Sequence, residues 1–532
     1  MGISTFFGLN VGMSALDMAQ QAEAVISNNI SNSNTPGYVQ ESAVLQEADP
    51  YPPLPSTNAP IMGGQLGQGV QVAQVQRLTS SFLNKQDRTN QSTSNKYDTL
   101  AQNLTQIEQI VNEPSSQSLQ NALDNFFGSW QTLSTSPSSI PARQAVIAEG
   151  QTLGQTFQMV TTQLEDMQSN LTGTVQNQLQ ELNQYAQQVA TLNKQIISIN
   201  NMNQSGQPLV ESPNQLEDQR GHVLDEMSQL ANIAYTQNSD GSISVSIGSG
   251  TSIPGNIPLV SETTFYTLNT MSALPTSTSN PSFIVPGTGS AFLAVTSAAY
   301  SGTLTGGTGT SLDINLQYVS GGQIAGNVQG LDETNQVLAQ MDSFLSTLAN
   351  QVNSIQTSGY ALGATTPSTI SFFTLATTSA NNVILQVNPT LTAQDVAAAT
   401  GANLPGDNSN ALLMVNNAWN GYPSTTMTAT YSYSSLESNQ SIPITSSSNA
   451  TFDQMLTGYV SQLGIASAAA NSNQQTADAL SQQSSSLRQS VSGVDLNEQA
   501  AQMVEYQNLY SAAAKFISIV DSMLQTAINM IP

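Results

Sequence analysis

The residues of this chain that could do acid–base or metal chemistry are few. His222 is the only histidine, and no second histidine stands at metal-binding spacing from it. A lone histidine can act as a general base or a ligand. Asp225-Glu226 and Asp332-Glu333 are adjacent carboxylates, and neighbouring positions on a helix do not face one site. We therefore expect these side chains to lie on solvated helix surfaces, with no catalytic residues and no metal site.

Motifs for nucleotides and nucleophiles are missing as well. The sequence has no G-x-S-x-G elbow, no P-loop and no glycine fingerprint after a strand. The glycine-rich stretch Thr305–Thr310 lacks a lysine and a following helix, which indicates a loop. Trp130 and Trp419 are predicted to be core anchors. We predict that the protein is not an enzyme and has no cofactor.

The charge balance excludes two classes of partner. The 532 residues include nine Lys and Arg against 34 Asp and Glu, for a formal net charge of −25. No basic residue precedes Arg77, and none lies between Arg220 and Arg488. Such an acidic chain is repelled by nucleic acid and anionic lipid. No run of 18 apolar residues occurs, so we also expect no membrane insertion.

Two further features bear on the compartment. The chain has no cysteine, which rules out disulfides and thiolate metal sites. Its first residues lack a basic region and an Ala-x-Ala cleavage site. The expectation is that the protein stays in the cytosol or leaves by a route that cleaves no such signal.

Both ends of the chain have the strongest helical patterns. The first 30 or so residues carry two apolar stripes on nearly opposite sides, and the last 36 or so carry three apolar rows with a seven-residue repeat. Three rows need more than one partner helix, so one intramolecular helix pair is the weaker alternative. Helices that bury only against neighbouring chains would be disordered in the monomer. The predicted assembly interface consists of Phe6, Leu9, Met13, Leu16, Phe7, Val11, Met18, Val25, Leu496, Met503, Tyr506, Leu509, Tyr510, Phe516, Ile517, Val520, Met523, Leu524 and Ile531.

A run of helix-breaking residues should end the first helix. Asparagine favours turns, proline cannot continue a helix, and glycine permits positive φ. The residues concerned are Asn28, Asn29, Asn32, Asn34, Pro36 and Gly37.

Helical and β-leaning regions alternate along the rest of the chain. Helix is predicted over about 78–110, 142–203 and 328–356 and from Phe452 onward, with a four-residue step between Leu171 and Val175 that resembles a coiled-coil stutter. Asp240-Gly241 before an alternating run predicts a hairpin. A second alternating strand is expected at 383–387, and short helices at Ala393–Ala399 and Asn410–Trp419.

The predicted fold class is multidomain α+β, with a long α-helical coiled-coil or bundle rod built from both termini and mainly-β domains inserted at its far tip. The predicted domains, by residue number, are a terminal helical assembly domain (1–49 and 490–532), a Pro-rich linker (50–65), a helical rod (66–232 with 326–358 and 449–489), a β insertion (233–325) and a second, mainly-β insertion (359–448).

Several motifs resemble those of one protein family. Asn28-Asn29-Ile30-Ser31-Asn32 with Asn34-Thr35-Pro36-Gly37-Tyr38 resembles the N-terminal signature of bacterial flagellar axial proteins, which form the rod, hook and hook-associated structures. The stretches 490–498 and 506–515 are similar to the hook-associated branch at the hook–filament junction. The internal segments Leu216–Arg220, Gly406–Leu412 and Trp130 with Pro141–Gln144 agree with that branch.

The resemblance implies a structural adaptor that joins the hook to the filament as a ring of subunits. Implied partners are other copies, the hook protein, a second hook–filament junction protein and an export chaperone on the C-terminal helix. Implied localisation is outside the cell, at the junction, after export of the unfolded chain. Another axial subunit (hook, distal rod or second junction protein) is the first alternative. A secreted adhesin or enzyme carried on such a scaffold is the second, although the β-leaning stretches are poor in acids.

Overall fold

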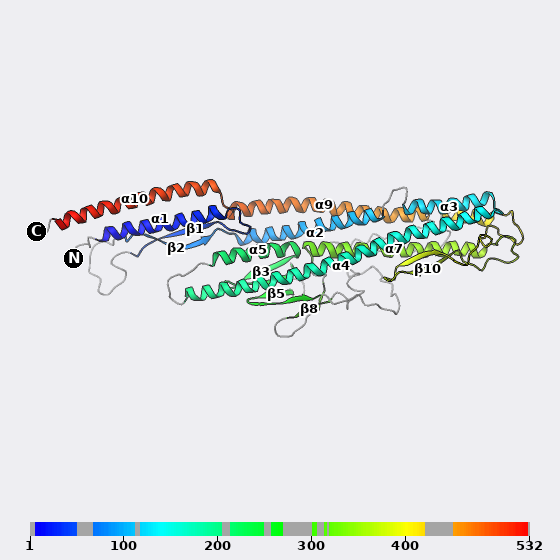
Figure 1. Ribbon diagram of the computed structural model, residues 1–532, viewed down its shortest axis with the longest axis horizontal. Coiled ribbons are helices and arrows are strands. Elements are labelled where there is room, and N and C mark those ends of the chain that lie inside the picture. Colours follow the sequence, from blue (N-terminus) through cyan, green and yellow to red (C-terminus); the bar gives the residue numbers. More distant parts are fainter. Residues whose placement is uncertain are drawn as a thin grey trace.

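The long helices of this protein run side by side and make an elongated molecule (Figure 1). The computed structural model describes residues 6–49, 67–111, 118–204, 213–248, 257–269, 301–305, 313–315, 319–420 and 451–529. The predicted linker at 50–65 and Ile531 lie outside these ranges. None of the described helices is long and apolar enough to cross a membrane.

Helices supply most of the framework. The predicted helical zones are confirmed, and the zone at 142–203 is one continuous helix of 65 residues. The helix Phe452–Ser492 begins with a capping box, in which Thr451 Oγ1 accepts from Gln454 N and the Gln454 side chain accepts from Thr451 N. The helices are α1 (Phe7–Asn32), α2 (Ser81–Val111), α3 (Leu119–Thr135), α4 (Ile140–Gln204), α5 (Asn214–Leu230), α7 (Gly322–Ser358), α8 (Ser409–Asn420), α9 (Phe452–Ser492) and α10 (Leu496–Asn529).

Strands form small separate antiparallel sheets. β1 (Glu41–Glu47) pairs with β2 (Val70–Arg77), and β10 (Phe373–Thr377) pairs with β11 (Val383–Val387). The predicted hairpin is confirmed, because β3 (Ile233–Gln237) pairs with β4 (Ile243–Ile247) across a turn in which Gly241 has a φ of +88°. The remaining strands, in two sheets ordered β3-β4-β5-β6 and β7-β8-β9, are β3 (Ile233–Gln237), β4 (Ile243–Ile247), β5 (Ile257–Ser261), β6 (Thr264–Phe265), β7 (Thr267–Asn269), β8 (Ser301–Thr305) and β9 (Asp313–Asn315).

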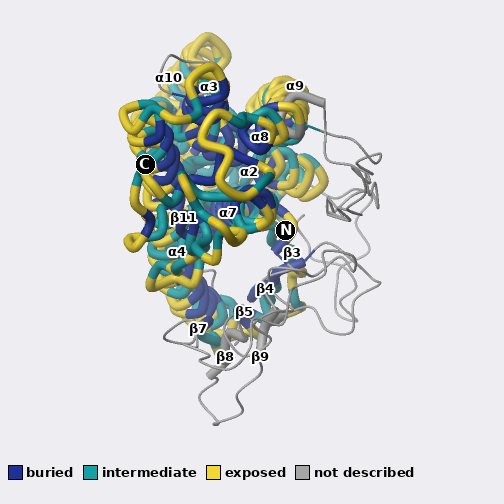
Figure 2. The backbone as a smooth tube through the Cα atoms, turned by 90° about the vertical axis from the view of Figure 1, so that its right-hand side faces the viewer, coloured by how far each residue is buried: buried dark blue, intermediate teal, exposed yellow. Residues whose placement is uncertain are grey.

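Helix α4 belongs to two hydrophobic cores. Its residues from Val146 to Leu171 pack with α2, α3, α7 and α9, whereas those from Val175 to Ala190 pack with α5 and the β3–β6 sheet. The change of core falls at the predicted stutter. A four-residue step rotates the apolar rows around the helix, so the same helix presents one face to each core. In the end-on view, the buried positions gather between the helices (Figure 2).

The first β region does not lie at the far tip of the rod. Its β3–β6 sheet packs beside α4 and α5, and only the β10–β11 hairpin lies toward the far end (Figure 1). Asn193 of α4 fixes this sheet, because its Nδ2 donates to Ile243 O at 2.8 Å and its Oδ1 accepts from Ile243 N at 3.2 Å. The far-tip prediction is therefore wrong for residues 233–269.

Residues 359–420 share the core of the helical body instead of having one of their own. Phe372 and Phe373 pack against Phe126, with ring centroids 5.5 and 5.4 Å away, and Phe372 also contacts Trp130. Asn353 of α7 pairs with the backbone of Phe373, accepting from its N at 2.8 Å and donating to its O at 2.9 Å. This part of the predicted second insertion thus packs on the helical body and shares its hydrophobic core.

The helix predicted at Ala393–Ala399 is wrong. This stretch is irregular, because side chains satisfy its backbone: Ala397 N donates to Gln356 Oε1, and Ala397 O accepts from Asn410 Nδ2. Asp395 also accepts from Thr392 N and closes a turn. The helix predicted at Asn410–Trp419 is confirmed as α8.

Candidate functional site

The two terminal helices pair with each other in an antiparallel arrangement. Gly8 lies level with Val520, Gly12 with Ile517, and Asn29 with Gln499. Gln507 donates to Glu23 at 3.3 Å between the same helices. The prediction that these helices bury only against other chains is wrong, since each covers one face of the other. Because the two helices cover each other within one chain, we no longer expect both ends to be disordered in the monomer.

The seam between these helices is built from small residues on α1. Gly8, Gly12, Ala15, Ala19, Ala22, Ile26 and Asn29 alternate at spacings of four and three, as in a coiled coil. Most of them are buried. Glycine and alanine let two helix backbones approach closely, and large residues of α10 fill the space. The seam lies between the two predicted stripes of large apolar residues.

The predicted interface residues divide by exposure. On α1, Met18 is buried, Phe6 and Met13 are exposed, and Leu9, Leu16, Phe7, Val11 and Val25 are half-buried. On α10, one apolar row, here called the inner row (Tyr510, Ile517, Leu524), is half-buried, as are Met503, Tyr506 and Val520. A second row, the outer row (Leu509, Phe516, Met523), is exposed, with Met523 at 67%. Leu496, Val504 and Ile519 are also exposed.

The helix-terminating motif works through its side chains. α1 ends at Asn32, whose Nδ2 donates to Asn28 O at 3.1 Å, and Thr35 N donates to Asn32 O at 2.9 Å. Gly37 has a φ of +78°, a conformation that suits glycine. An added Cβ on Gly37 would meet His222 Cβ at 2.6 Å. The turn therefore places the chain against α5, where the lone histidine is a surface residue.

A polar corner lies where α1, α10 and β1 meet. Asn29 is 1% exposed, and its Nδ2 donates to Gln499 Oε1 at 2.9 Å and to Glu41 O at 2.8 Å. Its Oδ1 accepts from Tyr38 Oη at 2.8 Å and Glu41 N at 2.9 Å. Burial and the nearby carboxylates of Glu41 and Asp218 raise the pKa of Tyr38, which keeps the phenol protonated.

Ion-paired Arg77 attaches the β1–β2 sheet, next to the α1–α10 pair, to helix α5. Arg77, at the end of β2, donates to Asp218 Oδ1 at 2.7 Å and Glu217 Oε2 at 2.9 Å on α5. Asp218 also accepts from Val39 N at 3.2 Å. Burial raises the pKa of Asp218 to about 6, against the opposing effect of Arg77. Arg220 points the other way, toward Asn193 and Gly241 O, and binds the β3–β4 turn.

A second ionic group lies beside the first. Arg488, near the end of α9, contacts Asp87 Oδ2 at 3.1 Å and Asp225 Oδ1 at 3.0 Å. Arg88 donates to the same Asp225 oxygen at 2.7 Å. These contacts and the Arg77 group, together called the joint, use three of the five arginines of the chain. Burying these charges is tolerated because each one has an ion-pair partner, which offsets the cost of removing it from water.

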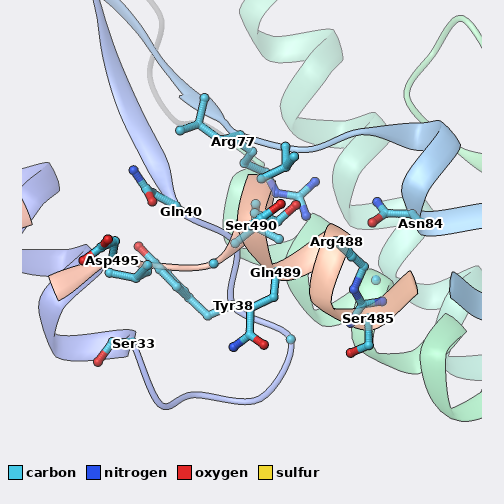
Figure 3. A pocket seen from close by; sticks show the side chains of 18 of the residues that line it. Ser33, Tyr38, Gln40, Arg77, Asn84, Ser485, Arg488, Gln489, Ser490 and Asp495 are labelled. Atoms are coloured by element: carbon cyan, nitrogen blue, oxygen red, sulfur yellow. The ribbon is translucent and has the colours of Figure 1, made fainter. Parts of the chain in front are cut away.

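The joint borders a polar cavity of about 970 Å³. Arg77, Tyr38, Gln40 and Ser490 converge on it from β2, the α1–β1 turn and the end of α9 (Figure 3). Gln40 N donates to Ser492 O at 2.9 Å at its wall. Acidic and basic side chains line it together, so it has no excess of positive charge. Among the described residues, no group of three or more His, Asp and Glu side chains could hold a metal ion.

The joint was missed as a site in the sequence, although two signals pointed to it. The sparse arginines were conspicuous in an acidic chain, and the segment Leu216–Arg220 was singled out as a motif. Their pairing joins residues about 140 positions apart, which periodicity does not reveal. The predicted interface residues remain a prediction for contacts with other chains.

Comparison with known proteins agrees with this arrangement. The family model of the flagellar hook-associated protein FlgK helical domain matches residues 104–373, just over half of the chain. This chain belongs to the flagellar hook-associated protein FlgK family. Models of the flagella basal body rod protein and of the flagellar basal body rod FlgEFG protein C-terminal region match residues 9–38 and 483–530. Those two segments contain the α1–α10 pair and its approach to the joint.

Individual relatives of the FlgK family extend the match. Flagellar hook-associated protein 1 of Bacillus subtilis (strain 168) is 26% identical over 99% of this chain and 98% of its own length. The protein of the same name from Salmonella typhimurium is 31% identical over 46% of this chain and 41% of its own length. The solved structure of the flagellar hook junction protein FlgK from Burkholderia pseudomallei has a TM-score of 0.56 at 15% identity, over 76% of this chain and 100% of that one. It supports the fold, a helical rod with inserted β domains. Membership of the FlgK family gives this chain a structural role in the flagellar axis.

Proposed function

We propose that this protein is the adaptor that joins the hook to the filament, and that it assembles as a ring through the outer faces of α1 and α10. The observation that carries the proposal is the outer row of α10. Leu509 and Met523 are exposed on a helix that already packs on α1, and Phe516 remains 44% exposed although one side of its ring lies against Gly12. A buried apolar side chain of this size stabilises a contact by about 1.5–3 kcal/mol. Burial of such a row against another subunit would therefore stabilise the assembly.

The partners follow from the family and from this surface. Other copies of the chain would cover the outer row within the ring, with the hook protein on one side and a second junction protein on the other. Before assembly, an export chaperone would hold α10, since its outer row is the exposed apolar surface. Export of the unfolded chain is compatible with the absence of cysteine, because no disulfide can trap a folded state.

A second candidate is another axial subunit, such as a hook or distal rod protein. The matches of rod-protein models to residues 9–38 and 483–530 favour it, because these terminal segments are shared among such proteins. The match over 104–373 favours the hook-associated branch. Labelling the protein on flagella in situ distinguishes the two, since only a junction protein is confined to the boundary between hook and filament.

The assembly proposal is tested by charging the outer row. Leu509→Asp and Met523→Asp should leave the protein folded and exported, but filament subunits should be shed into the medium, because an unpaired carboxylate cannot be buried between subunits. Ser518→Asp, on an exposed position of the same helix, is the matched control and should support swimming. Ile517 is unsuitable here because it faces Gly12. Normal motility of both outer-row variants would contradict the proposal.

A further inference from the structure

Helix α1 has an exposed face on the side away from its seam with α10. Each residue of this face stands two positions before a seam residue, which places it about 200° around the helix from the seam. Asp17, two positions before Ala19, is the only charged residue among them. The residues of this face, all exposed and here called the α1 back face, are Asn10, Met13, Asp17, Gln20 and Ala24.

Helix α10 has a corresponding face behind its contact with α1. The residues of α10 that turn toward α1 repeat every seven positions and are Gln499, Tyr506, Ala513 and Val520. Two positions after each of them, again about 200° around the helix, stands an exposed residue. These residues, here called the α10 back face, are Ala501, Asn508, Lys515 and Ser522. Lys515 is thus the only charged residue of this face.

Apolar residues accompany the α10 back face. Val504 is 56% exposed and stands three positions after Ala501, and Ile519 is 54% exposed and stands four positions after Lys515. Residues at these spacings are neighbours on a helix surface. Each residue of the outer row follows a back-face position by one, so the outer row borders this face. A partner seated here would bury apolar surface around a single positive charge.

Lys515 and Asp17 are the charges that the two back faces offer to a partner. The described part of the terminal unit, which is α1 with β1, β2 and α10, has one other basic residue, Arg77, and it is paired with Glu217 and Asp218. Neither Asp17 nor Lys515 forms an ion pair with a described residue of its own chain. Because each copy has a net charge of −25, most contacts between copies bring carboxylates together. A contact that joins Lys515 to Asp17 avoids this repulsion.

The two charges have nearly the same height along the α1–α10 pair. They lie on opposite outer sides of it and therefore do not meet within one chain. Gly12 is level with Ile517, and the helices are antiparallel. Asp17 is therefore level with Ala512, which is three residues or about 4.5 Å along the axis from Lys515. A ring whose axis runs along these helices keeps the same heights in every copy, so the two charges of neighbouring copies come within reach of each other.

We propose that the α10 back face of one copy packs on the α1 back face of the next copy, with Lys515 paired to Asp17 of that copy. Two different faces meet in this contact, and such a heterologous contact closes into a ring when its rotation permits. A symmetric contact of α10 with α10 would place Lys515 against Lys515, which like charge disfavours. The inference rests on the proposed function and adds to it the neighbour that each terminal helix meets. The ion pair selects this partner, and the apolar residues beside it supply the affinity.

Charge reversal tests the pair in intact flagella. Lys515→Glu and Asp17→Lys each place like charges opposite one another, and the ratio of attached filaments to shed filament subunits should fall by about tenfold. The double variant exchanges the two charges and should restore the ratio of the parent. Lys194→Glu, which reverses an exposed lysine of α4, is the matched control and should have no effect. The purified variants should keep the melting temperature of the parent, because both side chains are exposed.

Cross-linking tests the direction of the contact, and the chain has no cysteine of its own. The variant with both Asp17→Cys and Lys515→Cys removes the two charges together, so neither is left unpaired. A short bismaleimide added to isolated flagella should then give a ladder of covalent oligomers in steps of the 56.0 kDa chain, because each copy carries both halves of a link. Each single cysteine variant should give monomers.

Three results would overturn the inference: no ladder from the double cysteine variant, dimers from Lys515→Cys alone, or no recovery in the double charge reversal. The proposed function has its own separate readouts, which are the position of the labelled protein on the flagellum and the shedding caused by the outer-row variants. A protein found at the boundary between hook and filament, with outer-row variants that shed filament subunits but with no ladder, would still be the junction adaptor. Its copies would then meet through other faces.

Discussion

Gly12 of α1 lies against Ile517 of α10, so close that a Cβ added to Gly12 would come 2.7 Å from Ile517 Cγ1. The same Cβ would lie 3.1 Å from Phe516 Cδ1. Gly8, one turn away, has ordinary room, with 3.6 Å to Val520. Of the two glycines, Gly12 therefore lies closer to α10.

Gly12→Leu should separate the terminal helices. The new side chain cannot fit without moving α10, and overpacking of this kind costs about 1–3 kcal/mol. Amide hydrogen exchange of the full chain should become faster in α1 and α10 and stay unchanged in α4. Gly8→Ala is the control and should be neutral or slow the exchange, because alanine favours helix over glycine by about 1 kcal/mol. Unchanged protection in Gly12→Leu would show that the helices are not held at this distance.

Arg488→Gln should weaken the joint. Asp87 is 5% exposed and loses its cation, whereas Asp225 keeps Arg88. Leaving a carboxylate buried without its partner should cost about 1–3 kcal/mol, a reduced value because Arg488 is partly exposed. Thermal unfolding measures this loss. Lys515→Gln removes a cation from the exposed surface of α10 and should change stability by less than about 0.5 kcal/mol. Equal effects of the two substitutions would rule out a structural role for the joint.

Stability should rise as the pH falls from neutrality. Burial raises the pKa of Asp332 to about 6, and the pKa of Asp342 shifts in the same direction. In the unfolded chain, both carboxyls have a pKa of about 4. The stabilisation is complete below that value and is lost as the pH rises through about 6, where the folded protein must ionise a buried acid.

Asp332→Asn mimics the protonated acid. At pH 7 it should raise the free energy of unfolding by about 1–3 kcal/mol, and the gain should fade near pH 4. Denaturant unfolding at several pH values measures it. Glu505→Gln, on the exposed side of α10, should have little effect at any of them. A gain in Asp332→Asn that is the same at pH 7 and pH 4 would contradict this explanation.

The long helices were predictable because their cores repeat over many turns. Leu153, Phe157 and Leu164 continue one pattern in α4, and all are buried. Helix α3 was not predicted, although the spacing of Leu119, Leu123, Phe126, Trp130 and Leu133 is helical. The helix predicted at Ala393–Ala399 does not form, because Gln356 and Asn410 supply hydrogen bonds to this backbone from other parts of the chain.

The site was predictable only in part. Large apolar residues drew attention to the terminal helices, but the seam is made of Gly8, Gly12, Ala19 and Ala22, which carry little hydrophobic signal. Which apolar residues of α10 are exposed could not be predicted, because this depends on which face of the helix α1 covers. Ion pairs such as Arg77–Asp218 depend on tertiary approach and leave no periodic trace in the sequence.

The continuity of α4 has a mechanical consequence. At 1.5 Å per residue, its 65 residues extend for about 98 Å, and they enter both hydrophobic cores without a break. Twisting one core relative to the other would have to shear the packed apolar rows on either side of the Leu171–Val175 step. Torque applied at the terminal helices would therefore reach the far end of the body as rigid rotation, with little of it absorbed between the cores.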